Sequence, residues 1–185
     1  MVRAVSSVRV PVRGDSRLWL EGSSNVRDWT CKATSMDATI EVESKAGSKG
    51  TESSAATGVN KVIVKVPVRM LKCGDRHMEA QMYSALKSSD AGATHIIAHF
   101  DRLPDGVVTG ETIETSGLLT IAGVERTVRM TVSSDRLPDG TRRARGTVPI
   151  LMTDFGIKPP KPWGGLLRTS NKVLIQFEIF IAPII

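Results

Sequence analysis

The sequence predicts an all-β fold, an antiparallel β-barrel of about eight strands with one short α-helix. Three observations predict it. Apolar residues recur at every second position along most of the chain, which is the period of a strand. The hexapeptide DRLPDG occurs twice, each time between two such segments. Only residues 76–87 have the spacing of a helix.

The alternation is clearest in KVIVKVPV, where Val62, Val64, Val66 and Val68 share one face. The same pattern occurs in HIIAHF, LLTIAG, VRMTV and KVLIQFEIF, which are rich in residues that favour strands. The residues that share one face in these segments are Ile96, Ala98, Phe100, Leu119, Ile121, Val128, Met130, Val132, Val173, Ile175, Phe177 and Ile179. If these faces point inward, they form one apolar interior.

Both copies of DRLPDG, at residues 101–106 and 135–140, are predicted to be hairpin turns. Pro fixes φ, and Gly accepts the left-handed backbone that a tight reversal needs. A calcium-binding loop is excluded because no Glu follows at the required position. A helical repeat is excluded because the residues between the two copies alternate with the period of a strand.

The predicted helix begins behind Asp75, a favourable N-cap, and Met78, Met82 and Leu86 follow at spacings of four. We expect this methionine stripe to pack against the sheet rather than to bind a cofactor. Residues 44–60 are rich in Gly, Ser, Thr and Ala and have no periodicity. They predict a long mobile loop or a hairpin tip.

The length of 185 residues indicates a single domain, which we place at residues 16–185 after an N-terminal extension of residues 1–15. No apolar run is long enough to span a membrane. The N-terminus lacks the continuous apolar stretch of a secretory signal. The protein is therefore expected to be cytosolic, or a signal has been removed.

The net charge of +6 permits association with anions, but only TRRARG gathers three arginines, Arg142, Arg143 and Arg145. Aromatic residues make up 4% of the chain, so the mixture of aromatic and basic residues typical of a base-stacking surface is missing. We expect no nucleic-acid partner.

No arrangement of residues in the sequence specifies an enzyme. The DFG at residues 154–156 copies a kinase motif, but the other kinase motifs are absent. His95 and His99 share a face of a predicted strand, about 13 Å apart, which is too far for one metal ion. The serines and the three histidines form no recognisable catalytic motif. We therefore predict no catalytic residues, no cofactor and no metal site.

The two cysteines, Cys31 and Cys73, are too few for a zinc site, and a disulfide is the favoured pairing. It would close a loop of about forty residues and contribute about 3 to 4 kcal/mol by chain entropy. Such a bond persists only in an oxidising compartment. The alternative is two separate buried thiols in a cytosolic protein.

Four segments of the chain together resemble the YceI-like family, in this order and at these separations. They are LEGSSNVRDWTCKA, PVRMLKCGDRHMEAQMYSALKS, GLLTIAGVERTVRMTV and TDFGIKPPKPWGGLLRTSNKVLIQFEI. The resemblance as a whole covers nearly the entire chain from Ser16 to Ile179. The resemblance implies a lipocalin-like barrel around an apolar channel that holds polyisoprenoids, isoprenoid quinones or other long-chain lipids. It also implies a periplasmic or secreted protein whose signal has been removed, and a homodimer is compatible with it.

The inward faces predict an apolar lining, and Ala98, Gly117 and Gly146 are small where a filled core would favour bulk. Trp29, Phe155 and Trp163 are expected near a barrel mouth, with Trp163 on a gating loop. The predicted ligand-binding residues are Val64, Val66, Ile96, Ala98, Phe100, Leu119, Ile121, Val128, Met130, Phe155, Trp163, Val173, Ile175 and Phe177.

Taken with the resemblance, these residues predict non-catalytic binding, transport or storage of an isoprenoid, a quinone, a fatty acid or another long-chain lipid. The same inward residues are also those with which a closed barrel fills its core. The main alternative is therefore a closed barrel that serves as a structural or protein-interaction module without a small ligand. An enzyme on the same scaffold is the least favoured reading.

Overall fold

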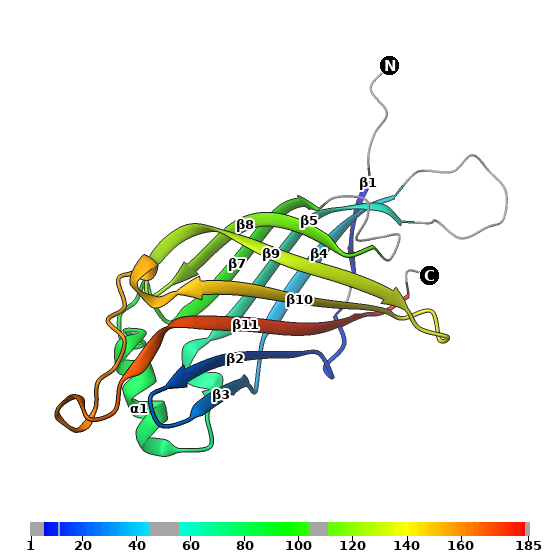
Figure 1. The fold of residues 1–185 in the computed structure, drawn as a ribbon. Coiled ribbons are helices and arrows are strands. Elements are labelled where there is room, and N and C mark those ends of the chain that lie inside the picture. The colour runs from blue at the N-terminus through cyan, green and yellow to red at the C-terminus, as the bar shows by residue number, and fades with distance from the viewer. Residues whose placement is uncertain (1–5, 11, 45–55, 104–110, 184–185) are drawn as a thin grey trace, which may run out of the picture.

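The computed structural model describes residues 6–10, 12–44, 56–103 and 111–183 (Figure 1). Eleven strands of this part of the chain form a single antiparallel sheet that curls around an apolar interior, in the order β1-β4-β5-β7-β8-β9-β10-β11-β2-β3-β6. The strands are β1 (Ser6–Val10), β2 (Arg17–Ser24), β3 (Asp28–Ala33), β4 (Asp37–Ser44), β5 (Ala56–Pro67), β6 (Leu71–Lys72), β7 (His95–Leu103), β8 (Ile113–Ile121), β9 (Val124–Arg136), β10 (Arg142–Leu151) and β11 (Thr169–Ile181).

For the described residues, the all-β antiparallel class and the one α-helix are confirmed, but the expected number of about eight strands is wrong. That number rested on the size at which up-and-down barrels commonly close. Two of the strands, β1 and β6, are not among the segments from which the sequence predicts a strand. β6 contains only two residues, and β1 lies within residues 1–15, which we expected to form an N-terminal extension.

Two stretches of backbone link the two sides of the curled sheet. Near the helix, β5 continues through a 3-10 turn, η1 (Val68–Met70), into β6, so one run of chain pairs first with β4 and β7 and then with β3. At the opposite end, β1 pairs with β4, and Val12 then bridges to Ile181 on β11. The backbone N–H of Arg13 also donates to the carbonyl of Phe180 at 2.8 Å. The two sides of the sheet are thus connected by backbone at both ends of the seam.

The inward faces are those that the alternation predicts. On β9, buried residues at every second position alternate with exposed or half-buried neighbours from Val128 to Ser134, and β11 has buried residues with the same spacing at Val173 and Ile175. The core therefore lies inside the curl of the sheet, and it includes residues from both of its sides. Burial of these apolar side chains is the main force that holds the curled sheet together.

The second DRLPDG copy forms the predicted hairpin turn between β9 and β10. Leu137 N–H donates to the carbonyl of Thr141 at 2.8 Å, and Gly140 N–H donates to the carbonyl of Leu137 at 3.0 Å. Gly140 has a φ of 83°, the left-handed conformation that Gly adopts without strain. The Asp139 carboxylate accepts from the backbone N–H and the hydroxyl of Thr141, both at 2.9 Å. These bonds fix the turn.

The first DRLPDG copy joins β7 to β8, which pair antiparallel, so it also belongs to a hairpin. Its first three residues, 101–103, continue β7, while residues 104–106 lie outside the described residues. The Gly- and Ser-rich stretch at 44–60 likewise joins two paired strands, β4 and β5. Its residues 56–60 belong to β5, and the loop predicted for 45–55 lies outside the described residues.

The predicted helix is confirmed as α1 (Arg76–Ala85), which lies across one end of the barrel (Figure 1). The Asp75 carboxylate caps it by accepting from the N–H of Met78 at 2.9 Å, and this hydrogen bond lowers the pKa of Asp75. No residue of α1 is fully buried. The helix therefore rests on the barrel end rather than inside its core, and side chains outside the core help to hold it.

A disulfide between Cys31 and Cys73 joins β3 to the segment that precedes α1, which confirms the predicted pairing. The same segment is held by Glu79, whose carboxylate accepts from the N–H of Cys73 at 3.0 Å, and by the Tyr83 hydroxyl, which donates to the carbonyl of Leu71 at 2.8 Å. The position of α1 at the barrel end is thus fixed by one covalent bond and a few polar contacts.

Two of the small residues do not leave the open space that the sequence predicts, so that prediction is wrong for Gly117 and Gly146. The ring of Phe100 lies over Gly117, and the ring of Phe177 lies over Gly146 on the neighbouring strand. A Cβ at Gly117 would lie 2.1 Å from the Phe100 ring, and one at Gly146 would lie 2.2 Å from the Phe177 ring. Each glycine accommodates an aromatic ring rather than a void.

We expect Gly117→Ala to lower the free energy of unfolding by about 1 to 3 kcal/mol, because the new methyl group forces the Phe100 ring to move within a packed interior. Thermal or urea denaturation measures this loss. Gly92→Ala is the matched control, since a Cβ at Gly92 meets no atom within 4 Å. Equal stability of the two variants would show that Phe100 does not depend on the glycine for its place.

Candidate functional site

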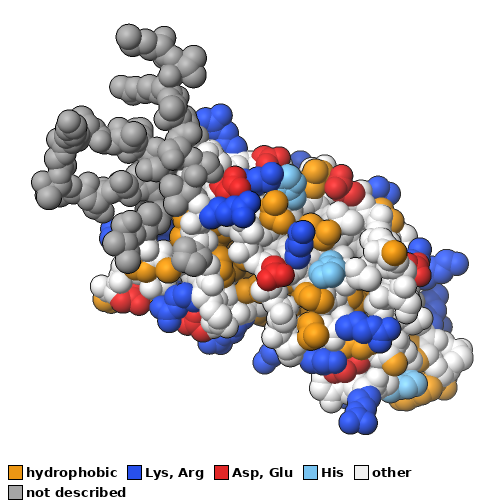
Figure 2. Space-filling model, turned by 180° about the vertical axis from the view of Figure 1, so that it is seen from behind, with side chains coloured by type: hydrophobic (Ala, Val, Ile, Leu, Met, Phe, Trp, Pro, Cys, Tyr) orange, Lys and Arg blue, Asp and Glu red, His pale blue; other side chains and the backbone are white. Residues whose placement is uncertain are grey.

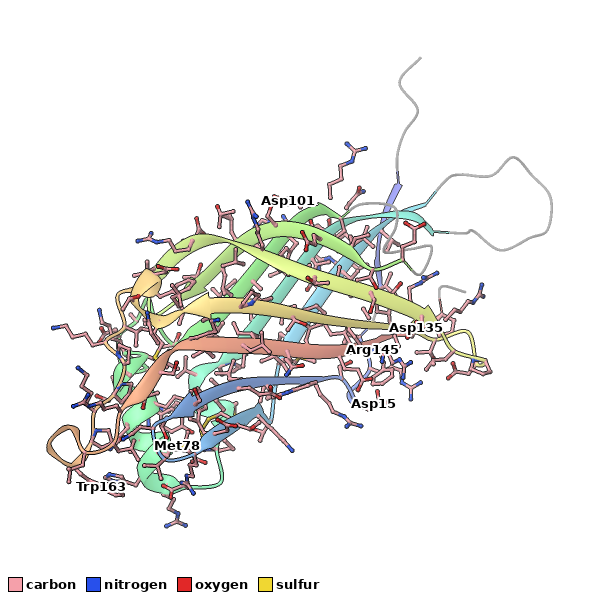
Figure 3. The ribbon with its side chains drawn as sticks, in the orientation of Figure 1. Asp15, Met78, Asp101, Asp135, Arg145 and Trp163 are labelled. Atoms are coloured by element: carbon pink, nitrogen blue, oxygen red, sulfur yellow. A yellow bond between two sulfur atoms is a disulfide. The ribbon has the colours of Figure 1, made fainter. Side chains whose placement is uncertain are left out.

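A cavity of about 200 Å³, cavity 1, opens at the barrel end beneath α1. Its walls come from α1, from the β2–β3 hairpin, from the loop that precedes β11 and from the inner faces of the neighbouring strands. Met78 and Met82 contribute from the helix, and Trp163 contributes from the loop. Figure 3 shows Met78 and Trp163 at this same end of the molecule.

A second cavity of about 100 Å³, cavity 2, lies deeper in the barrel. Every residue that lines it has an apolar side chain, so it offers no side-chain hydrogen bond to a guest. Leu20, Ile96 and Ile175 line both cavities. The two spaces are therefore adjacent, and these three side chains stand between them. Together the volumes lie near the lower end of the range for small-molecule sites, about 300 to 1,000 Å³.

Polar groups in this site are confined to cavity 1. Arg27 comes from the β2–β3 hairpin, Asp75 from the helix cap, and His77 and Gln81 from α1. Gln81 Nε2 lies 3.0 Å from His77 Nε2. The nearby Arg27 guanidinium helps to lower the pKa of Asp75, after the larger effect of the capping hydrogen bond. The site therefore changes from polar at one end to wholly apolar at the other.

Trp29 combines two features at the wall of cavity 1. The six-membered part of its indole lies over Gly22, where a Cβ would be 2.1 Å from the ring, and the two residues are cross-strand partners on β2 and β3. Its Nε1 is buried and has no hydrogen-bond partner among the described residues. Buried donors are usually paired, so this unpaired nitrogen is an exception in the wall of the cavity.

The structure brings thirteen of the fourteen predicted site residues to one cavity or the other. Cavity 1 receives Ile121, Trp163 and Val173, and both cavities share Ile96 and Ile175. Cavity 2 receives Val64, Val66, Ala98, Phe100, Leu119, Val128, Met130 and Phe177. Their contact with a ligand stays a prediction.

Phe155 is the exception among the predicted residues. It belongs to the 3-10 turn η2 (Met152–Phe155), is only 2% exposed and lines neither cavity, so it serves as a core residue. Trp163 lies as predicted on a loop at the barrel mouth, in the 3-10 turn η3 (Trp163–Gly165), and its side chain is 69% exposed.

Sequence reasoning missed several residues of cavity 1, including Leu20, Met152 and Ile157, which come from β2 and from the region around η2. The methionine stripe of α1 was expected only to pack against the sheet. Met78 and Met82 do pack against the core, but they also line the cavity. Their identity as methionines could have indicated this role, because the flexible apolar side chain of Met adapts to ligands of varied shape.

The polar features that the sequence singles out lie elsewhere. Arg143 and Arg145 both donate to the Asp135 carboxylate, at 2.9 and 2.8 Å, and the hydrogen bond from Arg143 is the main reason why the pKa of Asp135 is lowered. Figure 3 shows Asp135 and Arg145 near the barrel end opposite Trp163. His99 pairs with Asp101 at 3.0 Å. The described residues hold no cluster of ligating side chains suited to a metal ion.

Within the described ranges, no helix is long and apolar enough to cross a membrane. The curled sheet and the cavities together define a lipocalin-like barrel with an apolar interior. The chain belongs to the YceI-like family, since the model of the YceI-like domain matches residues 15–181. No protein with a curated description matches the sequence.

Solved structures with the same fold include three bacterial proteins. BcnA of Burkholderia cenocepacia is 16% identical, with a TM-score of 0.70 over 93% of this chain and 100% of that one. A polyisoprenoid-binding domain from Saccharophagus degradans, implicated in plant cell wall breakdown, is 12% identical, with a TM-score of 0.63 over 98% and 100%. The Campylobacter jejuni YCEI protein is 13% identical, with a TM-score of 0.55 over 88% and 85%. At these identities the likeness concerns the fold.

Proposed function

We propose that the protein binds a long-chain apolar lipid, such as an isoprenoid or an isoprenoid quinone, inside the barrel without catalysis, and so acts as its carrier or reservoir. The observation that carries this proposal is the pair of adjacent cavities, of which the deeper has only apolar side chains in its wall. A hydrocarbon tail gains about 25 cal/mol for each Å² of apolar surface removed from water, so no chemical step is needed for binding.

The gradient of polarity indicates how such a ligand would lie. The tail passes between Leu20, Ile96 and Ile175 into cavity 2, because a polar head group there would lose its hydrogen bonds to water without replacement. The head group stays in cavity 1 near Arg27 and Gln81, where polar side chains are available. The relative from Saccharophagus degradans, described as a polyisoprenoid-binding domain, supports a ligand of this class.

The disulfide supports a particular environment for this function. Disulfides persist in oxidising compartments and are rare in the cytosol. The Cys31–Cys73 bond is thus consistent with a periplasmic or secreted carrier. Such a carrier would move or store a lipid in the water outside membranes. A homodimer stays a prediction.

The proposal predicts that affinity depends on tail length. In a series of isoprenoid quinones with a constant head group, each added isoprene unit should strengthen binding by about tenfold or more, until the tail fills the interior. Beyond that length the affinity should level off, because further units remain in water. Isothermal titration calorimetry in a fixed concentration of mild detergent measures the series.

The matched control for the series is the isolated head group without a tail, which should bind at least about a hundredfold more weakly than the longest quinone. Affinity that is independent of tail length would contradict the proposal. Failure to bind any member would favour the closed barrel that interacts with proteins.

A further inference from the structure

We propose that the barrel end around the mouth of cavity 1 docks on an anionic lipid bilayer. The docking surface consists of the exposed apolar residues Val26, Trp163 and Leu166 and the basic residues Arg27, Lys158, Lys161 and Arg168. This inference rests on the proposed function, because direct docking would let an apolar tail pass between a membrane and the barrel without crossing water.

The most exposed large apolar side chains of the described residues all lie on this surface. Leu166 is 79% exposed, Trp163 69% and Val26 68%. The other exposed apolar residues, Met70, Leu118 and Leu151, are 36% to 43% exposed. A soluble domain gains nothing in stability from such side chains, so their concentration at one end indicates an apolar partner.

Hydrogen bonds hold these apolar residues at one place although they are far apart in the sequence. Asn25, the neighbour of Val26, donates through its side-chain amide to the carbonyl of Leu166 at 3.0 Å. Its side-chain oxygen accepts from the N–H of Arg168 at 2.6 Å, and its own N–H donates to the carbonyl of Arg168 at 3.1 Å. The β2–β3 hairpin and the loop before β11 are therefore joined into one rim around the mouth of cavity 1, and this rim carries the docking surface.

The backbone around Trp163 holds its side chain outward. Trp163, Gly164 and Gly165 have φ values of 54°, 65° and 89°, three successive residues in the left-handed region. That conformation is uncommon for a residue with a bulky side chain. Local strain of this kind concentrates at functional sites. Here it keeps an indole exposed at the mouth of the cavity that it also lines.

The charges of the rim favour an anionic partner. The segments 24–28, 75–77 and 156–168 carry five basic residues and two acidic ones. The basic residues are Arg27, Arg76, Lys158, Lys161 and Arg168, and the acidic ones are Asp28 and Asp75. Arg27 lies close enough to Asp75 to help lower the pKa of that carboxyl group. Figure 2 shows hydrophobic side chains beside Lys and Arg at the end of the molecule opposite the grey residues.

This composition fits a bilayer better than a protein partner. An exposed Trp with neighbouring Leu and Val, flanked by Lys and Arg, is typical of segments that lie in the membrane interface and contact anionic headgroups. The cavity also opens at this end, so a docked barrel would direct its mouth toward the lipid.

Vesicle flotation of the full chain tests the proposal. We expect the wild-type protein to float with vesicles of phosphatidylethanolamine and phosphatidylglycerol, less with neutral phosphatidylcholine vesicles, and less as ionic strength rises. The double variant Val26→Ser, Leu166→Ser should bind the anionic vesicles about tenfold more weakly or worse, since it removes two apolar contacts. Lys158→Gln with Lys161→Gln should reduce binding to anionic vesicles and leave binding to neutral ones unchanged.

Leu118→Ser is the matched control, because Leu118 is exposed on β8 and lies outside the docking surface. It should float as the wild type does, and circular dichroism of all variants verifies their folding. Equal flotation of the wild type and the Val26, Leu166 variant would overturn the proposal, as would a wild type that binds neither kind of vesicle.

The lipid content of the same samples, measured by native mass spectrometry, separates the two proposals. A wild-type protein that carries lipid but does not float overturns the docking surface alone and directs the search to a protein acceptor. A wild-type protein that floats but neither carries nor takes up lipid supports the docking surface and overturns the proposed function. Val26 and Leu166 line neither cavity, so their variant should still take up lipid from detergent.

Discussion

Ala98→Phe should abolish the uptake of long-tailed lipids. Ala98 lies on β7 opposite Val64 of β5 and Leu119 of β8, and all three line cavity 2. A phenyl ring at this position would occupy much of a cavity of about 100 Å³ and block the path of the tail. We expect the affinity for a long isoprenoid quinone to fall at least about a hundredfold, because most of its apolar surface would remain in water.

Calorimetric titration with a long and a short quinone measures this effect. The short quinone should lose less affinity, since it does not need to fill cavity 2. Ala80→Phe is the matched control, because Ala80 is exposed on α1 and lines neither cavity. Thermal denaturation must show that Ala98→Phe remains folded, with an overpacking cost of about 1 to 3 kcal/mol. A folded Ala98→Phe protein with unchanged affinity for the long quinone would place the tail elsewhere.

Removal of the Cys31–Cys73 disulfide should lower the free energy of unfolding by about 4 kcal/mol, the chain-entropy value for residues this far apart. The two cysteines are separated by 42 residues, and the loop between them contains β4, β5 and β6. The bond also connects β3 to the start of α1, which has no fully buried residue. We therefore expect α1 to loosen before the sheet unfolds.

Urea denaturation of Cys31→Ala with Cys73→Ala measures the loss, and hydrogen exchange of α1 reports its loosening. A strong reductant should destabilise the wild type to a similar extent and leave the double variant unchanged, which separates the bond from the effect of truncating the buried Cys31. A double variant as stable as the oxidised wild type would show that the bond does not constrain the unfolded chain.

The interior of the barrel could be predicted from sequence because strand alternation is a local property. Val64, Ile96 and Ile175 each stand in a segment whose apolar residues occupy every second position, so their inward direction follows from the period of a strand. The helix could also be predicted from sequence, since Asp75 caps it and its apolar residues recur at spacings of four. The presence of only two cysteines favoured a disulfide over two separate thiols, and the structure contains the bond.

The remaining features depend on which strands are neighbours, and sequence does not give the register. Gly117 was interpreted as open space, but the Phe100 ring covers it from the adjacent strand. Phe155 is predicted near the barrel mouth, whereas η2 turns it into the core. β6 has only two residues, so its pairing with β3 alone defines it. The rim held by Asn25 joins two loops that are distant in sequence.

Native mass spectrometry of the freshly purified protein, followed by organic extraction and mass analysis of the released compound, shows whether the barrel holds a lipid. We expect a stoichiometric adduct whose mass corresponds to an isoprenoid, an isoprenoid quinone or another long-chain lipid. A mass equal to that of the polypeptide alone, which persists after incubation with quinones and fatty acids, would contradict the claim that the barrel holds a lipid.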